Sequence, residues 1–192
     1  MTVDVQSPPP LQAGSLSLRA PAMKDLPALT AVWGDPRVAR YWTGDPLSAD
    51  ECRAKLDGIL AANAAGDCLQ WGVSTEPTGA LIGTCTIWKI DRGQRRAELG
   101  IAIGADHWGR GHARAALGRV LQYGFEDLQL HRLEADVDPD NAASLRLFEA
   151  LGFQREGLLR QRWFMHGRWC DSVLLGLLKP EWAEYGVSAP FD

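Results

Sequence analysis

Residues 98–117 constrain the fold of this chain most, because their pattern changes from that of a strand to that of a helix across a glycine-containing loop. Apolar and small residues alternate through Leu99, Ile101 and Ile103, and this period of two predicts a strand. From residue 113 onward the apolar side chains recur every three or four positions, which predicts an amphipathic helix. The chain is therefore expected to pass directly from a strand into a helix here.

The loop between these two elements predicts a site for a phosphorylated ligand. Gly109 and Gly111 leave the backbone bare where the helix begins, and a helix N-terminus offers unpaired N–H groups and partial positive charge. Arg110 and Arg114 are four residues apart and so lie on one helix face, where they add positive charge. The alternative interpretation is a tight turn without a ligand, since short glycine motifs are weakly specific.

Two common phosphate-binding motifs do not fit this loop. A dinucleotide-binding fingerprint requires a third glycine at position 114, where the chain has arginine. It also requires an acidic residue at a strand end about twenty residues further on, in a region predicted here as helix. A P-loop requires Gly-Lys-Ser or Gly-Lys-Thr, which the chain lacks at this point.

A second motif lies at residues 141–153, Asn-Ala-Ala-Ser-Leu-Arg-Leu-Phe-Glu-Ala-Leu-Gly-Phe, after a strand predicted over 132–137 and a turn at 138–140. With the glycine loop it resembles the GNAT superfamily of N-acetyltransferases, which carries a Q/R-x-x-G-x-G/A loop followed by an N-x-x-(S/A)…L-G-F helix. Asp106 stands where the family has Gln or Arg, a departure that removes one side-chain contact. The resemblance covers about residues 16–182 and is greatest to the RimJ/RimL-type branch.

This resemblance implies a single mixed α/β domain with a central, twisted, mostly antiparallel sheet of about seven strands and about four flanking helices. The patterns of the chain predict helices over 24–33 and 48–65, the latter capped by Ser48 with Glu51 three residues later. Strands are predicted over 15–20, 69–74, 80–88, 154–164 and 169–178. Residues 1–14, with Ser-Pro-Pro-Pro, predict a flexible tail, followed by the domain at 15–182 and a C-terminal tail at 183–192.

The resemblance also implies a site for acetyl-CoA as co-substrate. It places the pantetheine arm along the backbone of Ile101, Ala102 and Ile103, and the pyrophosphate at the loop and helix start. The remaining expected contacts with the co-substrate are Gly109, Arg110, Gly111, His112, Ala113, Arg114, Asn141 and Phe148. For Asn141 the alternative is a helix cap without a ligand.

Two residues are candidates for the chemistry. Glu98 opens the predicted strand, where family members often place a carboxylate that takes the ammonium proton of the acceptor, directly or through water. The alternative for Glu98 is a surface residue paired with Arg95 or Arg96. Many relatives have a tyrosine at Phe148, and phenylalanine has no proton to donate. Ser144 is therefore expected to stabilise the departing thiolate, although serine there also suits a helix start.

Trp42 and Trp163 fall in regions where the family builds its acceptor pocket, and an aromatic wall there suits an amine. Ordinary packing is the alternative for each. No metal is expected: His107 and His112 lack a third ligand, and the acidic repeat at 136–140 lacks the glutamate and glycine of a calcium loop.

The global properties exclude several classes of protein. A formal net charge of −4 argues against general nucleic-acid binding, which needs a basic surface. The four cysteines are scattered without a C-x-x-C pair, which favours reduced thiols in a cytoplasm. No apolar run approaches about 18 residues and no signal peptide is evident, so we expect a soluble cytoplasmic protein without a membrane partner.

The sequence thus predicts an acetyl-CoA-dependent N-acetyltransferase that acts on a primary amine, either of a small molecule or of a peptide or protein N-terminus. Direct attack is expected because no cysteine falls within either motif. One alternative is a non-catalytic acyl-CoA-binding or regulatory protein of the same fold, which Phe148 keeps open. Another is a protein that binds a different phosphorylated ligand at the loop. The acceptor and the oligomeric state stay open, and a homodimer is implied by the resemblance alone.

Overall fold

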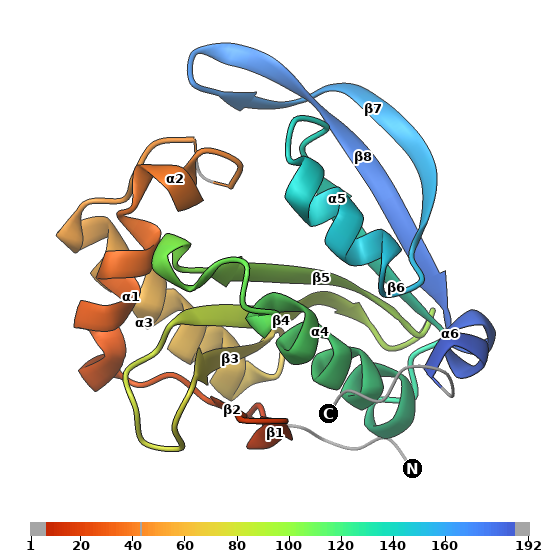
Figure 1. The fold of residues 1–192 in the computed structure, drawn as a ribbon, viewed down its shortest axis with the longest axis horizontal. Helices are drawn as coiled ribbons and strands as arrows, with labels where there is room; N and C mark the ends of the chain where they lie inside the picture. Colours follow the sequence, from red (N-terminus) through yellow and green to blue (C-terminus); the bar gives the residue numbers. More distant parts are fainter. Residues whose placement is uncertain (1–6, 43, 187–192) are drawn as a thin grey trace.

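The computed structural model describes residues 7–42 and 44–186. Its centre is an eight-stranded sheet in the order β1-β2-β3-β4-β5-β6-β8-β7 (Figure 1). The strands are β1 (Leu11–Ala13), β2 (Leu16–Arg19), β3 (Leu69–Ser74), β4 (Gly83–Asp91), β5 (Arg96–Ile103), β6 (Arg132–Val137), β7 (Gln154–Met165) and β8 (Arg168–Leu178). Every neighbouring pair is antiparallel except β5 and β6, which are parallel. The predicted mixed sheet is confirmed, with eight strands rather than about seven.

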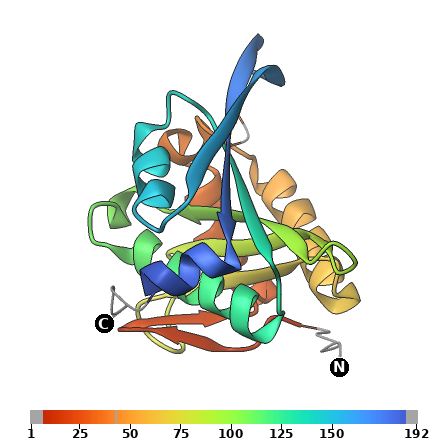
Figure 2. The ribbon, with the colours of Figure 1, turned by 90° about the vertical axis from the view of Figure 1, so that its right-hand side faces the viewer.

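Helices cover both faces of this sheet (Figure 2). One face carries α1 (Leu26–Trp33), α2 (Pro36–Ala39) and α3 (Ala49–Ala65), and the other carries α4 (His112–Gln122) and α5 (Ala142–Glu149), while α6 (Lys179–Gly186) follows β8. The predicted cap of α3 is present: Glu51 N–H donates to Ser48 Oγ at 3.3 Å, and Ser48 N–H donates to Glu51 Oε2 at 2.8 Å. None of the described helices is long and apolar enough to cross a bilayer.

Side chains of β5 alternate between two cores, which places this strand between the two helical layers. Leu99 and Ile103 are buried with residues of α4 and α5 in the larger core. Ala102 packs instead against the smaller core formed by α1, α2 and α3. Burial of apolar surface on both faces contributes most of the stability of such a layered domain and holds β5 firmly in position.

Regular elements extend into both segments that the sequence predicts as tails. Residues 11–13 form β1 and are not a tail, because their outer side chains are buried and the indole Nε1 of Trp71 donates to the carbonyl of Pro9 at 2.7 Å. A strand of three residues is too short to display a period of two, and the prolines that precede it favoured the prediction of a tail. At the other end α6 continues to Gly186, beyond the predicted domain limit at 182. Residues 1–6 and 187–192 of the two predicted tails lie outside the described residues.

Two differences occur inside the domain. β4 begins at Gly83, because residues 80–82 approach the sheet without joining it as a continuous strand. The short helix α2 occupies the link before α3, for which the sequence predicts no element. Its start is set by Asp35, whose side chain accepts a hydrogen bond from Arg37 N–H at 2.8 Å, followed by proline at the first helical position.

Candidate active site

The parallel strands β5 and β6 separate after a short region of pairing (Figure 1). Residues 96–98 pair with residues 132–134, and Glu98 lies opposite Glu134 in the last pair. Beyond it, residues 99–103 pair with β4 alone and residues 135–137 pair with β8 alone. In the part of the chain that the structure describes, one edge of β5 is therefore open, and Glu98 marks the closed end of the split.

The hydrogen-bond alternation of β5 determines which backbone groups face this open edge. Gly104 N–H donates to the carbonyl of Ile82 at 2.8 Å, so Gly104 and, two residues earlier, Ala102 direct their backbone groups toward β4. Ile101 and Ile103 consequently direct theirs toward the split. Ala102 was also expected to contact the ligand through its backbone; the ladder directs its N–H toward β4, and a contact with the ligand stays a prediction.

The glycine loop leads from this edge into α4. Gly109 and Gly111 have φ values of +72° and +78°, in the left-handed region that favours glycine. Gly111 is the N-cap of α4, and no side chain caps the helix, so the N–H groups of the first turn are free to bind an anion. Trp108 secures the loop to the strand, since its Nε1 donates to the carbonyl of Ile103 at 2.7 Å. The predicted strand–loop–helix unit is confirmed.

Charged side chains around the loop fall into two groups. Arg110 and Arg114 are both exposed near the start of α4, but Arg110 lies in the loop before the Gly111 cap and not on the helix face that the spacing predicts. Asp106, at the position where the family has Gln or Arg, pairs with Arg37 of α2 at 3.0 Å. The departure from the family pattern thus joins the loop to the neighbouring helical layer, and it leaves the free N–H groups of α4 unobstructed.

His112 begins α4 beside His107, with 6.4 Å between the ring centroids. Burial lowers the pKa of His112 below its usual value, and its electrostatic interactions with His107 and Arg110 lower that pKa further. The neutral imidazole therefore prevails at pH 7. Among the described residues no group of three or more His, Cys, Asp or Glu side chains is arranged to hold a metal ion.

The second motif forms α5, on the far side of the split. Asn141 caps this helix, since its Oδ1 accepts the N–H of Ser144 at 3.1 Å. Ser144 is half-buried in the first turn. Phe148 is only 3% exposed and packs edge-on against Phe153, with 5.1 Å between ring centroids. Asn141 is therefore a helix cap, and Phe148 is part of the core. Whether either residue also contacts a ligand stays a prediction.

The carboxylate of Glu98 is bound by a lysine that the sequence did not single out. Lys89 Nζ lies 2.8 Å from Oε1 and 2.9 Å from Oε2 of Glu98. The expected partners are engaged elsewhere: Arg95 donates to the carbonyl of Gln129, and Arg96 lies near two other carboxylates. The register of the β4–β5 hairpin is the signal that could have identified Lys89, because it sets Trp88 directly opposite Glu98.

The two tryptophans proposed for the acceptor pocket are both partly exposed and both have polar neighbours. Trp42 is 36% exposed, and Lys55 Nζ lies 4.2 Å from the centroid of its ring. Trp163 is 44% exposed, and its Nε1 donates to Asp136 Oδ1 at 3.3 Å. Asp136 lies on β6 beyond the point where the strands separate, so Trp163 reaches the split from β7.

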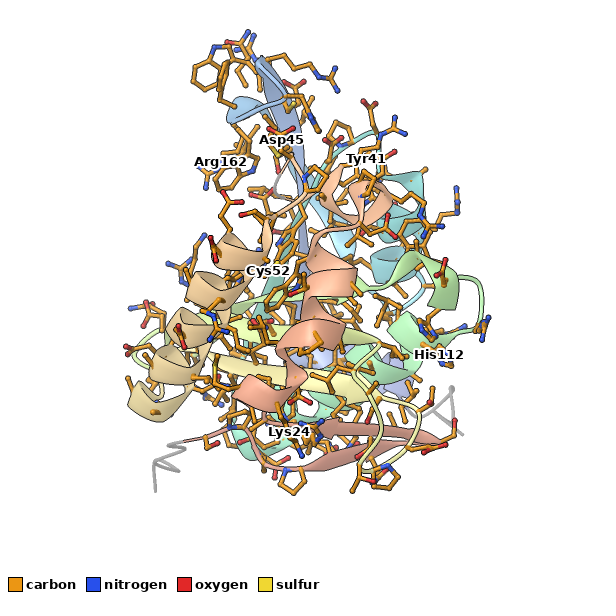
Figure 3. The ribbon with its side chains drawn as sticks, turned by 90° about the vertical axis from the view of Figure 1, so that its left-hand side faces the viewer. Lys24, Tyr41, Asp45, Cys52, His112 and Arg162 are labelled. Carbon is orange, nitrogen blue, oxygen red and sulfur yellow. The ribbon has the colours of Figure 1, made fainter. Side chains whose placement is uncertain are left out.

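The segments that carry these tryptophans meet at one end of the molecule. His166, in the turn between β7 and β8, lies with its Nε2 3.2 Å from the carbonyl of Arg40 and its Nδ1 3.8 Å from Asp45 Oδ1. Figure 3 shows Asp45 at the same end of the molecule as Arg162 of β7. The β7–β8 hairpin and the link before α3 thus approach each other across the open end of the split.

A family model described as an acetyltransferase (GNAT) domain matches residues 15–154. The chain belongs to the GNAT acetyltransferase family. Among relatives of this GNAT acetyltransferase, the uncharacterized N-acetyltransferase p20 of Bacillus licheniformis is 36% identical over 169 residues, which cover 88% of this chain and 95% of p20. A spermidine N(1)-acetyltransferase of Vibrio cholerae is 30% identical and is covered to 95% of its length, with 87% of this chain aligned.

A solved structure agrees with these sequence relationships. Spermidine N-acetyltransferase from Vibrio cholerae, in complex with CoA and spermine, superposes with a TM-score of 0.77 and 28% identity over 88% of this chain and 98% of that one. This GNAT acetyltransferase is therefore an enzyme of known family and fold. Its sheet is split between β5 and β6, and no side chain caps α4.

Proposed function

We propose that this GNAT acetyltransferase moves the acetyl group of acetyl-CoA to a primary amine by direct attack of the amine on the thioester. The observation that carries the proposal is the open edge of β5, which runs from Glu98 to the uncapped N-terminus of α4. The open edge of β5 supplies hydrogen-bonding backbone groups, and the N-terminus of α4 at the end of this edge supplies an anion site. An extended ligand with a pyrophosphate at one end has this distribution of polar groups.

The residues along the edge fit acetyl-CoA. Ile101 and Ile103 present backbone groups that can pair with the amides of the pantetheine arm, and one of their N–H groups can polarise the thioester carbonyl. Gly109 to Arg114 surround the free N–H groups of α4, where the pyrophosphate binds. On the other side of the split, Asn141 Nδ2 remains available for a ligand because its cap uses only Oδ1. When bound, acetyl-CoA supplies the activated acyl group.

Glu98 is the base that we assign to the acceptor amine. The side chain of Glu98 is 20% exposed, so it is accessible while most of its surface is shielded. Lys89 must move aside for an acceptor ammonium to reach it. Lys89 is 55% exposed, and separating such an ion pair costs only about 0–1 kcal/mol, so the acceptor can replace it.

Ser144 is the group that we assign to the departing thiolate. Its hydroxyl projects from the first turn of α5, and Asn141 fixes that turn. A serine hydroxyl is too weak an acid to protonate a thiolate of pKa about 8.5, so it stabilises the anion by a hydrogen bond while water supplies the proton. Phe148 cannot take this role because its side chain has no dissociable proton.

The acceptor belongs to one of two classes, small cationic amines or protein N-termini. The spermidine acetyltransferases among the relatives favour the first class, and the RimJ/RimL-type resemblance of the motifs favours the second. Glu98, Glu134 and Asp136 share one sheet face near the split, but each already contacts a cation of this chain. These carboxylates therefore do not by themselves select a polycation, and the acceptor must be identified by assay.

The decisive experiment is thiol release from acetyl-CoA across a panel of spermidine, spermine, aminoglycosides and peptides with free N-termini. We expect CoA release that depends on one class of amine, with the acetylated amine identified by mass spectrometry. Glu76→Gln is the matched control for Glu98→Gln, because Glu76 is exposed in the turn after β3.

Binding separates the remaining outcomes. Acetyl-CoA binding measured by calorimetry without release by any amine would contradict the proposed transfer to these acceptors. Failure to bind acetyl-CoA at all would contradict the assignment of the split and of the α4 N-terminus as the donor site.

A further inference from the structure

Lys89 holds its side-chain ammonium where an acceptor amine would have to be. Its Nζ donates to both oxygens of Glu98, the residue assigned above as the base, at 2.8 and 2.9 Å. The ring of Trp88 lies 5.6 Å from the same nitrogen, so the ammonium faces an aromatic surface as well as a carboxylate. The Lys89 side chain is thus a primary amine bound to the proposed base, as an acceptor substrate would be.

An irregularity in β4 produces this placement. The register between β4 and β5 shifts between Trp88 and Asp91, which is the signature of a β-bulge. Within it Lys89 has a φ of +47°, a conformation that residues with side chains rarely adopt and that costs about 1–3 kcal/mol when uncompensated. The bulge turns Lys89 back toward the face that carries Glu98, and the ion pair offsets part of the strain.

The same residue lies at the closed end of the proposed donor site. A ligand whose phosphates bind at the start of α4 and whose arm follows the open edge of β5 runs from Ile103 back toward Glu98. Five residues of strand span about 16 Å, a length comparable to an extended pantetheine arm. The reacting end of the ligand therefore comes to lie beside Glu98 and, with it, beside Lys89.

We propose that this enzyme acetylates its own Lys89, in a reaction that rests on the proposed function of the site. Glu98 takes one proton from the ammonium, the nitrogen lone pair forms a C–N bond with the thioester carbonyl carbon, and the C–S bond breaks. The second proton leaves the nitrogen with the thiol of CoA, and Glu98 returns its own proton to water. The product is Nε-acetyl-lysine, which has no positive charge and therefore releases Glu98 for an external acceptor.

The other lysines provide internal controls. The chain has four lysines, and Lys24 is exposed in the 3₁₀ turn before α1, at the opposite end of the molecule from Arg162 of β7 (Figure 3). Lys55 lies between two tryptophan rings, and Lys179 donates to a glutamine. Of the four, Lys89 alone is bonded to the base assigned above. Non-enzymatic acetylation would favour the accessible Lys24 at least as much as Lys89.

The test is incubation of the full-length protein with acetyl-CoA in the absence of any amine acceptor, followed by peptide mass mapping of the four lysines over time. We expect Lys89 to gain an acetyl group faster than Lys24, at a rate that does not depend on protein concentration because the reaction is intramolecular. Glu98→Gln should slow the modification of Lys89 by about 100-fold or more, since it removes the base. Lys89→Arg should remove the modified peptide while retaining the positive charge.

A second measurement needs no acetyl-CoA. The ammonium of a lysine held by a carboxylate exchanges its protons slowly enough to be observed by nitrogen-15 NMR, so the wild-type protein should show a Lys89 signal that Glu98→Gln abolishes. This readout tests whether the pair forms in solution, and backbone amide signals at the wild-type positions in the same spectrum would show that the Glu98→Gln variant is folded.

The outcomes distinguish this inference from the proposed function. Equal acetylation of Lys89 and Lys24, or modification unaffected by Glu98→Gln, overturns self-acetylation. Amine-dependent CoA release from a protein whose Lys89 stays unmodified overturns self-acetylation and leaves the proposed function intact. Absence of both reactions overturns self-acetylation and the proposed transfer to the acceptors tested, and failure to bind acetyl-CoA would in addition overturn the donor site.

Discussion

At the scale of single residues, Glu98 and Ser144 carry the proposed chemistry and can be tested separately. Glu98→Gln should lower kcat/KM for the acceptor by about 100-fold or more, because general bases contribute roughly that much. Ser144→Ala should cost less, about 10-fold, since it removes one hydrogen bond to the departing sulfur worth about 1.4 kcal/mol. Steady-state kinetics on the acceptor found by the amine panel measures both changes.

The control for both variants is acetyl-CoA affinity, because neither side chain contributes to the anion site at α4. Calorimetry should give dissociation constants close to that of the unmodified enzyme. A loss of affinity equal to the loss in kcat/KM would assign these residues to donor binding and would contradict their proposed roles.

At the scale of an element, the start of α4 depends on a backbone conformation that few residues tolerate. Gly111 has φ +78°, so Gly111→Val forces a β-branched residue into the left-handed region at a cost of about 1–3 kcal/mol. If the helix start shifts to relieve this strain, its free N–H groups no longer converge, and acetyl-CoA affinity should fall by at least about 10-fold. Gly58→Ala in the exposed middle of α3 is the matched control, where alanine should stabilise the protein by about 0.5–1 kcal/mol and leave affinity unchanged. An unchanged affinity in Gly111→Val would remove α4 from the donor site.

At the scale of the whole molecule, the split leaves the two halves of the sheet joined by only three residue pairs between β5 and β6. A ligand that fills the split should therefore stabilise the folded protein. At a concentration 100-fold above its dissociation constant, acetyl-CoA should add about 2.7 kcal/mol, which corresponds to an increase in Tm of about 5–10 °C for a domain of this size. Differential scanning calorimetry measures the shift, and Gly111→Val should show a smaller one. An equal shift in both proteins would place the ligand elsewhere.

Local signals predicted the elements whose patterns are long and regular. β3 and β6 have the predicted boundaries, and α3 begins at the predicted capping box. The β1 strand and the α2 helix were not predicted because each is too short to show a period, and each is stabilised by contacts with distant residues such as Trp71 or Asp106. Propensity alone is too weak to specify such short elements.

The amino-acid sequence by itself determined the strand–loop–helix unit, the glycines that the unit needs and the order of the two motifs, because these depend on local backbone preferences and on spacing along one element. Only the tertiary structure decided that β5 and β6 part at Glu98 and that Ala102 turns its backbone away from the split. The tertiary structure also decided that Glu98 pairs with Lys89 and not with Arg95 or Arg96. Register and a β-bulge set these contacts, and both arise from pairing between strands rather than from the pattern within either of them.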